Sequence, residues 1–122
     1  MNPLAELTND TTGRALRTAL DMASFTHQVI AHNIANANTP GFVPLRASFE
    51  GELSRAGADL ARPASWMRAE PDPEAARGAS GVSMLDTQVA KMNENMVRYQ
   101  MLLHGVNQRI ALIDMALNDG RK

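Results

Sequence analysis

Cysteine is absent from this chain of 122 residues, and aromatic side chains are scarce. Without thiols the chain forms no disulfide and no thiolate metal site, and both oxidising and reducing compartments stay open to it. Only one tryptophan, one tyrosine and three phenylalanines stand beside eight methionines, although 44% of the residues are hydrophobic. The core of an ordinary globular domain is rarely so poor in aromatic rings.

Excess charge of one sign and long apolar runs are also missing. The formal net charge is −1, and the basic and acidic residues are interspersed. No basic face of the kind that binds nucleic acid emerges, so we expect no nucleic-acid partner. No segment approaches the roughly 18 apolar residues of a membrane span. The start, MNPLAELTNDTTG, lacks the basic flank and apolar stretch of a secretory signal, so we expect any export to proceed without a cleaved signal peptide.

The C-terminal part of the chain carries a long heptad pattern. Its apolar residues recur in alternating steps of four and three, which is typical of a coiled-coil seam. We expect a helix over residues 83–118, which at about 1.5 Å per residue is on the order of 50 Å long. We call the residues of this pattern the seam: Leu85, Val89, Met92, Met96, Tyr99, Leu103, Val106, Ile110, Ile113 and Leu117.

A shorter helical pattern precedes it, over residues 13–37, with Leu16, Leu20, Ala23 and Ile30 on one stripe. The residues before it, 1–12, show no periodicity, and we expect a mobile tail there.

Residues 38–82, between the two patterns, hold five of the six prolines and five of the eight glycines. Such a density excludes a long helix, so we expect a connector in which residues 49–62 form at most a short helix or hairpin and residues 70–81 form a solvated linker. The fold class predicted is all-α, with one structural domain in which long N- and C-terminal helices pair as an antiparallel coiled coil around a largely irregular, Pro/Gly-rich middle segment.

Two helices of this kind have little core of their own. Burying the ten seam residues contributes roughly 15 to 30 kcal/mol at about 1.5 to 3 kcal/mol each. Fixing the backbone of the second helix costs on the order of 1 to 2 kcal/mol for every residue. We therefore expect a marginal monomer that neighbouring chains stabilise, as in coiled coils and stacked repeats.

The first helix ends in a run of carboxamides, NIANANTPGF, at residues 33–42. Asn36 and Asn38 tolerate the left-handed backbone that commonly closes a helix, so we expect the helix to close there. Pro40 and Gly41 suit the central positions of a type II turn. Capping does not explain Asn33, which lies a full turn inside the helix, where a buried carboxamide is unfavourable unless it is paired. A polar residue of this kind often fixes register and partner choice.

These residues resemble the N-terminal signature of the flagellar rod and hook axial proteins. The signature is an asparagine, an apolar residue, Ala-Asn, and then Thr-Pro-Gly-Tyr or a near variant. The C-terminal stretch LDTQVAKMNENMVRYQMLL, residues 85–103, resembles the shorter rod proteins of the FlgB type, above all at Asn95 and the triplet Arg98-Tyr99-Gln100. The N-terminal resemblance extends over residues 19–42, and together the two stretches cover about a third of the chain. The positions that match the N-terminal signature are Asn33, Ile34, Ala35, Asn36, Thr39, Pro40 and Gly41, with Phe42 in place of the usual tyrosine.

The resemblance implies a structural subunit of the bacterial flagellar basal body. In that family the terminal helices pair, and subunits stack into the hollow proximal rod and transmit motor torque. It implies as partners other copies of the chain, other rod proteins, the membrane-ring base and the flagellar type III export gate. It places the protein in the periplasmic portion of the basal body.

Other interpretations have weaker support. His27, His32 and His104 are not spaced as metal ligands, so we expect no metal, no cofactor and no small-molecule substrate. A helical enzyme that binds an anion between helices needs converging basic residues, and Arg98 and Arg109 are eleven positions apart. A self-contained helical bundle is disfavoured, because two helices joined by a long polar connector provide too little hydrophobic core. A cytoplasmic coiled-coil adaptor or export chaperone is the better alternative, since heptads alone suit it, but it has no evident need for the asparagine-rich cap.

Overall fold

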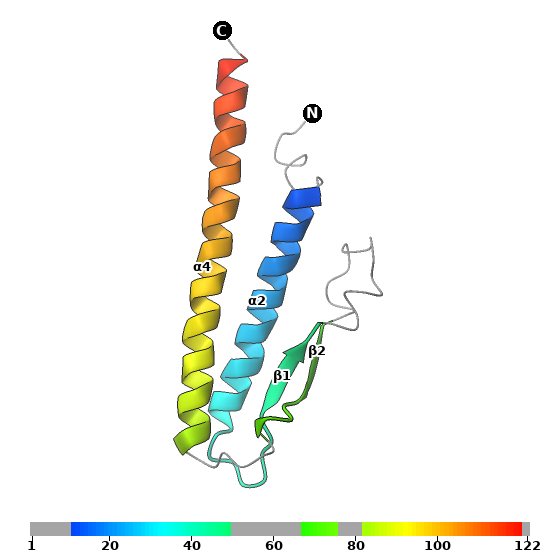
Figure 1. The fold of residues 1–122 in the computed structure, drawn as a ribbon, viewed down its shortest axis with the longest axis vertical. Coiled ribbons are helices and arrows are strands. Elements are labelled where there is room, and N and C mark those ends of the chain that lie inside the picture. The colour runs from blue at the N-terminus through cyan, green and yellow to red at the C-terminus, as the bar shows by residue number, and fades with distance from the viewer. Residues whose placement is uncertain (1–10, 50–66, 76–81, 121–122) are drawn as a thin grey trace.

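The computed structural model of the protein describes residues 11–49, 67–75 and 82–120. Two long helices dominate it: α2, Thr11–Ala35, and α4, Val82–Asp119. They run antiparallel and side by side, so the start of α4 lies beside the end of α2 (Figure 1). The predicted pair of long antiparallel helices is therefore confirmed. The tail expected over residues 1–12 and the element expected over 49–62 fall largely outside the described residues. The solvated linker expected over 70–81 is described as far as residue 75, and there it is wrong, because Glu70 and Pro71 belong to a strand and Asp72 is buried.

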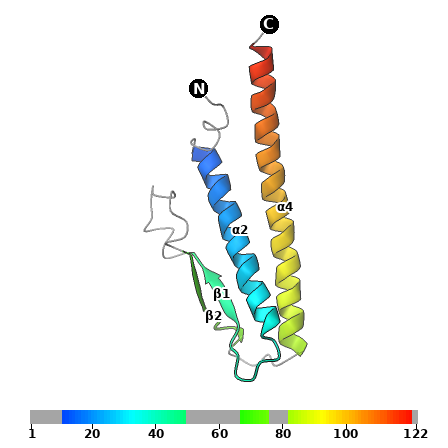
Figure 2. The same cartoon turned by 180° about the vertical axis from the view of Figure 1, so that it is seen from behind.

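The middle segment contains a small sheet that the sequence did not predict. Strand β1, Leu45–Ser48, pairs antiparallel with β2, Arg68–Pro71. Figure 2 shows the two strands beside α2, on the side away from α4. Each strand alternates apolar and polar residues, but over only four positions, and nineteen residues lie between the strands, so no local pattern specifies their pairing.

Helix α2 closes through short turns. The backbone N–H of Asn36 donates to the carbonyls of His32 and Asn33, both at 3.2 Å, and the next N–H, of Ala37, donates to Ile34 at 3.2 Å. Among the described residues no residue other than glycine has a positive φ angle, so the left-handed closure that we expected at the asparagines does not occur. Tight i→i+3 bonds satisfy the last carbonyls in its place.

The predicted type II turn is confirmed. The N–H of Phe42 donates to the carbonyl of Thr39 at 3.2 Å, and Gly41 between them has a φ angle of +74°. That angle belongs to the third position of a type II turn and favours glycine. The turn directs the chain back along α2, where β1 begins at Leu45.

The interior of the described residues is small and largely polar. Four hydrophobic residues are buried together with Pro44, and five polar or charged residues are buried with them. Apolar packing alone therefore specifies little of this fold, and directional hydrogen bonds carry much of the specificity. The buried hydrophobic residues are Ala23, Val29, Ile30 and Met84, and the buried polar residues are Thr18, Asn33, Asp72, Gln88 and Asn95.

Two glycines give predictions of opposite sign. A Cβ added at Gly41 meets nothing within 4 Å, so Gly41→Ala strains only the backbone at its positive φ and is expected to lower the free energy of unfolding by about 1 to 2 kcal/mol. A Cβ at Gly105, inside α4, meets Leu16 Cδ2 at an ordinary 3.8 Å, so Gly105→Ala is expected to raise it by roughly 0.5 to 1 kcal/mol. Urea denaturation followed by circular dichroism measures both changes, and equal shifts for the two variants would contradict this assignment.

Candidate functional site

Asn33 is the most buried side chain of the described residues, with 1% of its surface exposed. Its Nδ2 donates to the carbonyl oxygen of Leu45 at 2.7 Å and to Gln88 Oε1 at 3.0 Å. Its Oδ1 accepts from the backbone N–H of Leu45 at 2.8 Å. One carboxamide thus pairs with both polar groups of one residue, as a neighbouring strand would, and also reaches across to α4. Asn33 therefore joins α2, β1 and α4 at a single point, which we call the asparagine lock.

The rest of the signature shapes the return of the chain to this lock. Asn36 Nδ2 donates to the carbonyl of His32 at 2.9 Å, and Thr39 Oγ1 donates to Asn36 Oδ1 at 3.3 Å. The ring of Phe42 packs edge-on against His32, with centroids 5.5 Å apart. These contacts hold the turn that places Leu45 against Asn33. Along the signature, Ile34, Asn36 and Phe42 are half-buried, whereas Ala35, Thr39, Pro40 and Gly41 are exposed.

A second buried carboxamide joins the helices farther along. Asn95, with 3% of its surface exposed, donates from Nδ2 to the backbone carbonyl of Ala23 at 2.8 Å. Gln88 and Asn95 are seven residues apart, so they occupy equivalent positions of α4, both facing α2. In the sequence alone, Asn95 is distinguished only by the family resemblance, and Gln88 is not predicted as a functional residue. The signal available was a pair of carboxamides one heptad apart, immediately beside the seam.

Ion pairs hold the strands in place. Arg46 on β1 donates from Nε and Nη2 to Glu70 Oε1 on β2, at 3.0 and 2.8 Å. Asp72, directly after β2, is 5% exposed and lies 3.3 Å from Lys91 Nζ on α4. Burial raises the pKa of the Asp72 carboxyl, but the hydrogen bond from the Glu74 N–H and the charge of Lys91 outweigh burial and bring this pKa below its usual value. The hairpin is thus fixed to α4 by a charged carboxylate.

The face of α4 that packs on α2 is offset from the predicted seam. Met84, Gln88 and Asn95 are buried there, each one position before a seam residue, and one residue turns a helix by about 100°. The first-helix stripe does face α4: Ala23 and Ile30 are buried, and Leu16 and Leu20 are half-buried. Four seam residues are half-buried, namely Leu85, Met92, Val106 and Ile113. The other six are 37 to 46% exposed, namely Val89, Met96, Tyr99, Leu103, Ile110 and Leu117.

A second apolar stripe on α4 escaped the sequence analysis. Val97, Met101, Leu112 and Met115 are 57 to 70% exposed, and their spacings of four, eleven and three residues place them on one side of the helix. Helix α4 therefore presents exposed apolar side chains on two sides besides the face that packs on α2. Extended apolar surface of this kind marks interaction sites.

Replacement of Asn33 tests the lock. Asn33→Leu removes the partners of the buried Leu45 peptide groups and of Gln88 Oε1, so we expect the free energy of unfolding to fall by about 2 to 4 kcal/mol. Amide hydrogen exchange at Leu45 is expected to accelerate more than exchange in the middle of α2. Asn36→Leu is the control, because Asn36 is only half-buried and its bonds close a helix end, and a cost below about 1 kcal/mol is expected there. Equal costs for both variants would show that Asn33 is an ordinary cap.

Removal of the Asp72 charge tests how the hairpin is fixed. A lowered pKa in the folded chain means that the ionised carboxylate stabilises the fold above its ordinary value of 3.8 and that this stability is lost as the pH falls through the folded value. Asp72→Asn is expected to lower the free energy of unfolding by about 1 kcal/mol at neutral pH, since the half-exposed Lys91 is partly screened. The difference from the unmodified chain is expected to vanish in acid. Urea midpoints at several pH values measure it, with the exposed carboxylate of Asp86, replaced by asparagine, as the control; a difference that persists unchanged in acid would contradict the prediction.

Within the described residues, no helix is long and apolar enough to cross a membrane, and no three side chains of the types that bind metals are grouped together.

Comparison with known proteins finds one family that part of the chain resembles. Residues 14–42, about a quarter of the chain, match the family model described as flagella basal body rod protein. A comparison with curated proteins gives no match. The matched segment contains most of α2, the asparagine lock residue and the type II turn. The family consists of structural components of the rod and is not an enzyme family. Residues 14–42 of this chain are thus similar to the flagella basal body rod protein family.

Proposed function

We propose that this chain is a structural subunit of the proximal rod of the bacterial flagellar basal body, of the FlgB type. In this proposal the α2–α4 pair packs against copies of itself and against other rod proteins around a common axis, and it transmits motor torque. The observation that carries the proposal is the exposed seam of α4, combined with the rod-family match over α2 and its turn.

The seam supports assembly because its residues are apolar at coiled-coil spacing and six of the ten are 37 to 46% exposed in the free chain. Leu16 lies against Gly105, so α4 continues well beyond the first described turn of α2 (Figure 1). Ile110, Leu112, Met115 and Leu117 lie in that extension and are 40 to 66% exposed. Burying each such side chain against a neighbour contributes about 1.5 to 3 kcal/mol.

The asparagine lock suits the proposed mechanical role. Torque on a rod subunit acts to slide or rotate one helix against the other, and apolar packing resists sliding weakly because it has no preferred direction. The bonds that cross between the helices, from Asn33 to Gln88 and from Asn95 to the Ala23 carbonyl, are lost if α2 shifts by one residue along α4. They therefore hold the helices in a fixed register while neighbouring subunits load them.

The remaining parts of the proposal rest on the family resemblance. We place the subunit in the periplasmic portion of the basal body, next to the membrane-ring base. Its route there is the flagellar type III export gate. No cofactor or substrate enters the proposal, because its function is shape complementarity between packed helices.

A substitution in the seam tests the proposed function. Ile110→Glu places a charge on the seam where the free chain is already open, so its free energy of unfolding is expected to change by less than about 0.5 kcal/mol. Incorporation into basal bodies is expected to fall at least tenfold, since both apolar burial and the solvation of the new charge are lost on packing. Quantification of the chain in purified basal bodies, together with motility, measures this.

Ala111→Glu is the matched control, because Ala111 is exposed and adjacent to Ile110 but lies about 100° around the helix from it, outside the seam. It is expected to assemble normally. Normal incorporation of Ile110→Glu into basal bodies would show that the seam is not part of the assembly surface. Recovery of the unmodified chain only in the soluble cytoplasm, absent from basal bodies, would favour the adaptor or chaperone alternative over a rod subunit.

A further inference from the structure

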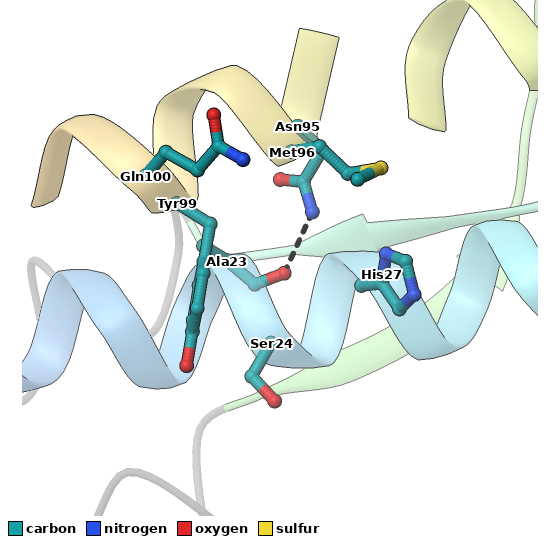
Figure 3. Close-up of a pocket in the computed structure, with 7 residues that line it drawn as sticks. All are labelled: Ala23, Ser24, His27, Asn95, Met96, Tyr99 and Gln100. Carbon is teal, nitrogen blue, oxygen red and sulfur yellow. Dashed lines mark hydrogen bonds between the residues drawn. The ribbon is translucent and has the colours of Figure 1, made fainter. Parts of the chain in front are cut away.

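A groove of about 350 Å³ lies between α2 and α4 beside the second buried carboxamide. Figure 3 shows Asn95 in this groove, with Ser24 and His27 contributed by α2 and Tyr99 and Gln100 by α4. Met96 and Tyr99 are also seam residues, so the groove opens onto the exposed seam. The complete lining is Ala23, Ser24, His27, Asn95, Met96, Tyr99 and Gln100.

One polar atom in the groove lacks a partner. Asn95 uses its Nδ2 on the Ala23 carbonyl, whereas its Oδ1 is buried and accepts no hydrogen bond from any described residue. A buried acceptor without a donor costs about 1 to 3 kcal/mol. By contrast, both ends of the Asn33 carboxamide are bonded. In the free chain, both polar atoms of the Asn33 carboxamide are therefore paired, whereas only the Nδ2 of Asn95 is paired.

The chemistry of the groove defines the group that would complete it. A donor N–H or O–H is needed at Asn95 Oδ1, and the walls formed by Met96 and Tyr99 favour an apolar stem. The lining contains no carboxylate, so a cationic donor would be buried without a counter-charge, which is unfavourable. A neutral carboxamide meets all of these requirements.

The chain itself presents such groups next to its seam. Asn93, Gln100 and Asn107 recur every seven residues along α4, and all three are exposed. They lie on the border of the seam, the position from which side chains reach across to a partner in helix pairs. We call these three residues the amide row.

We propose that the groove receives a carboxamide of the amide row from a second copy of the chain, whose N–H donates to Asn95 Oδ1. This inference rests on the proposed assembly through the seam and specifies one contact within it. The bond also gives the association a register, since the row offers a donor only once in two turns of α4.

Two variants of the full chain test the groove. Asn95→Leu removes the unpaired oxygen but also the Nδ2 bond to the Ala23 carbonyl, and the two effects offset in part, so the urea midpoint of the free chain is expected to fall only slightly, whereas self-association measured by sedimentation velocity weakens about tenfold. Ser24→Trp fills the groove from α2, where Ser24 is exposed, and is expected to weaken association at least tenfold with unchanged circular dichroism. The control is Ala31→Trp, which is exposed on α2 seven residues further on, outside the groove.

Disulfide trapping identifies the donor, because the chain has no cysteine of its own. Chains that carry only Ser24→Cys are mixed with chains that carry only Asn93→Cys, Gln100→Cys or Asn107→Cys, oxidised, and separated on a non-reducing gel. A mixed disulfide is expected with at least one of the three and with none when Ala31→Cys replaces Ser24→Cys.

The outcomes separate this inference from the proposed function. If the unmodified chain associates and both groove variants associate equally well, or if no mixed disulfide forms, the groove contact is wrong and assembly through the seam stands. If the unmodified chain remains monomeric at every concentration, the groove contact between copies is also wrong, whereas the proposed rod function is decided separately by incorporation into basal bodies.

Discussion

The pairing of the Asn33 carboxamide with the peptide groups of Leu45 is the interaction on which the rest of the structure depends. It converts the end of a helix into the docking edge for a strand, and its third bond, to Gln88, adds the second helix. Two consecutive elements and a helix 55 positions away in sequence thereby meet at one side chain with 1% exposure. A carboxamide suits this task because it combines two donors with an acceptor, like the peptide group that it pairs with.

This use of polar groups explains how so small an interior specifies one arrangement. With four buried hydrophobic residues, packing between α2 and α4 allows neighbouring registers at similar energy. Hydrogen bonds from Asn33 and Asn95 remove that freedom, because a shift of one residue leaves buried polar atoms unpaired. The register of the helix pair is therefore defined even where its total stability is small.

Local chemistry made the two helices and the turn predictable from the sequence. Heptad spacing over residues 85–117 and the Pro40-Gly41 pair act within a few residues, so a single sequence displays them. The hairpin was not predictable, since Leu45 meets Pro71 through a partner chosen by tertiary contacts. The heptad pattern likewise indicates which face requires burial but does not say whether the partner belongs to the same chain. Only the structure shows that α2 does not cover this face fully, because Gln88 is buried while its seam neighbour Val89 is exposed.

The offset between the two faces of α4 separates folding from association. Directional polar bonds lie on the face toward α2, and most of the large apolar side chains of α4 point elsewhere. Polar bonds set the shape of the subunit, because they depend on distance and angle, and the apolar stripes set how strongly it associates, because their contribution grows with the area buried. If the seam were buried against α2, it would stabilise the helix pair but leave little apolar surface for contacts with neighbouring subunits. The sequence instead places carboxamides where the helices meet, so the subunit acquires a defined register while most of its apolar surface remains available for assembly.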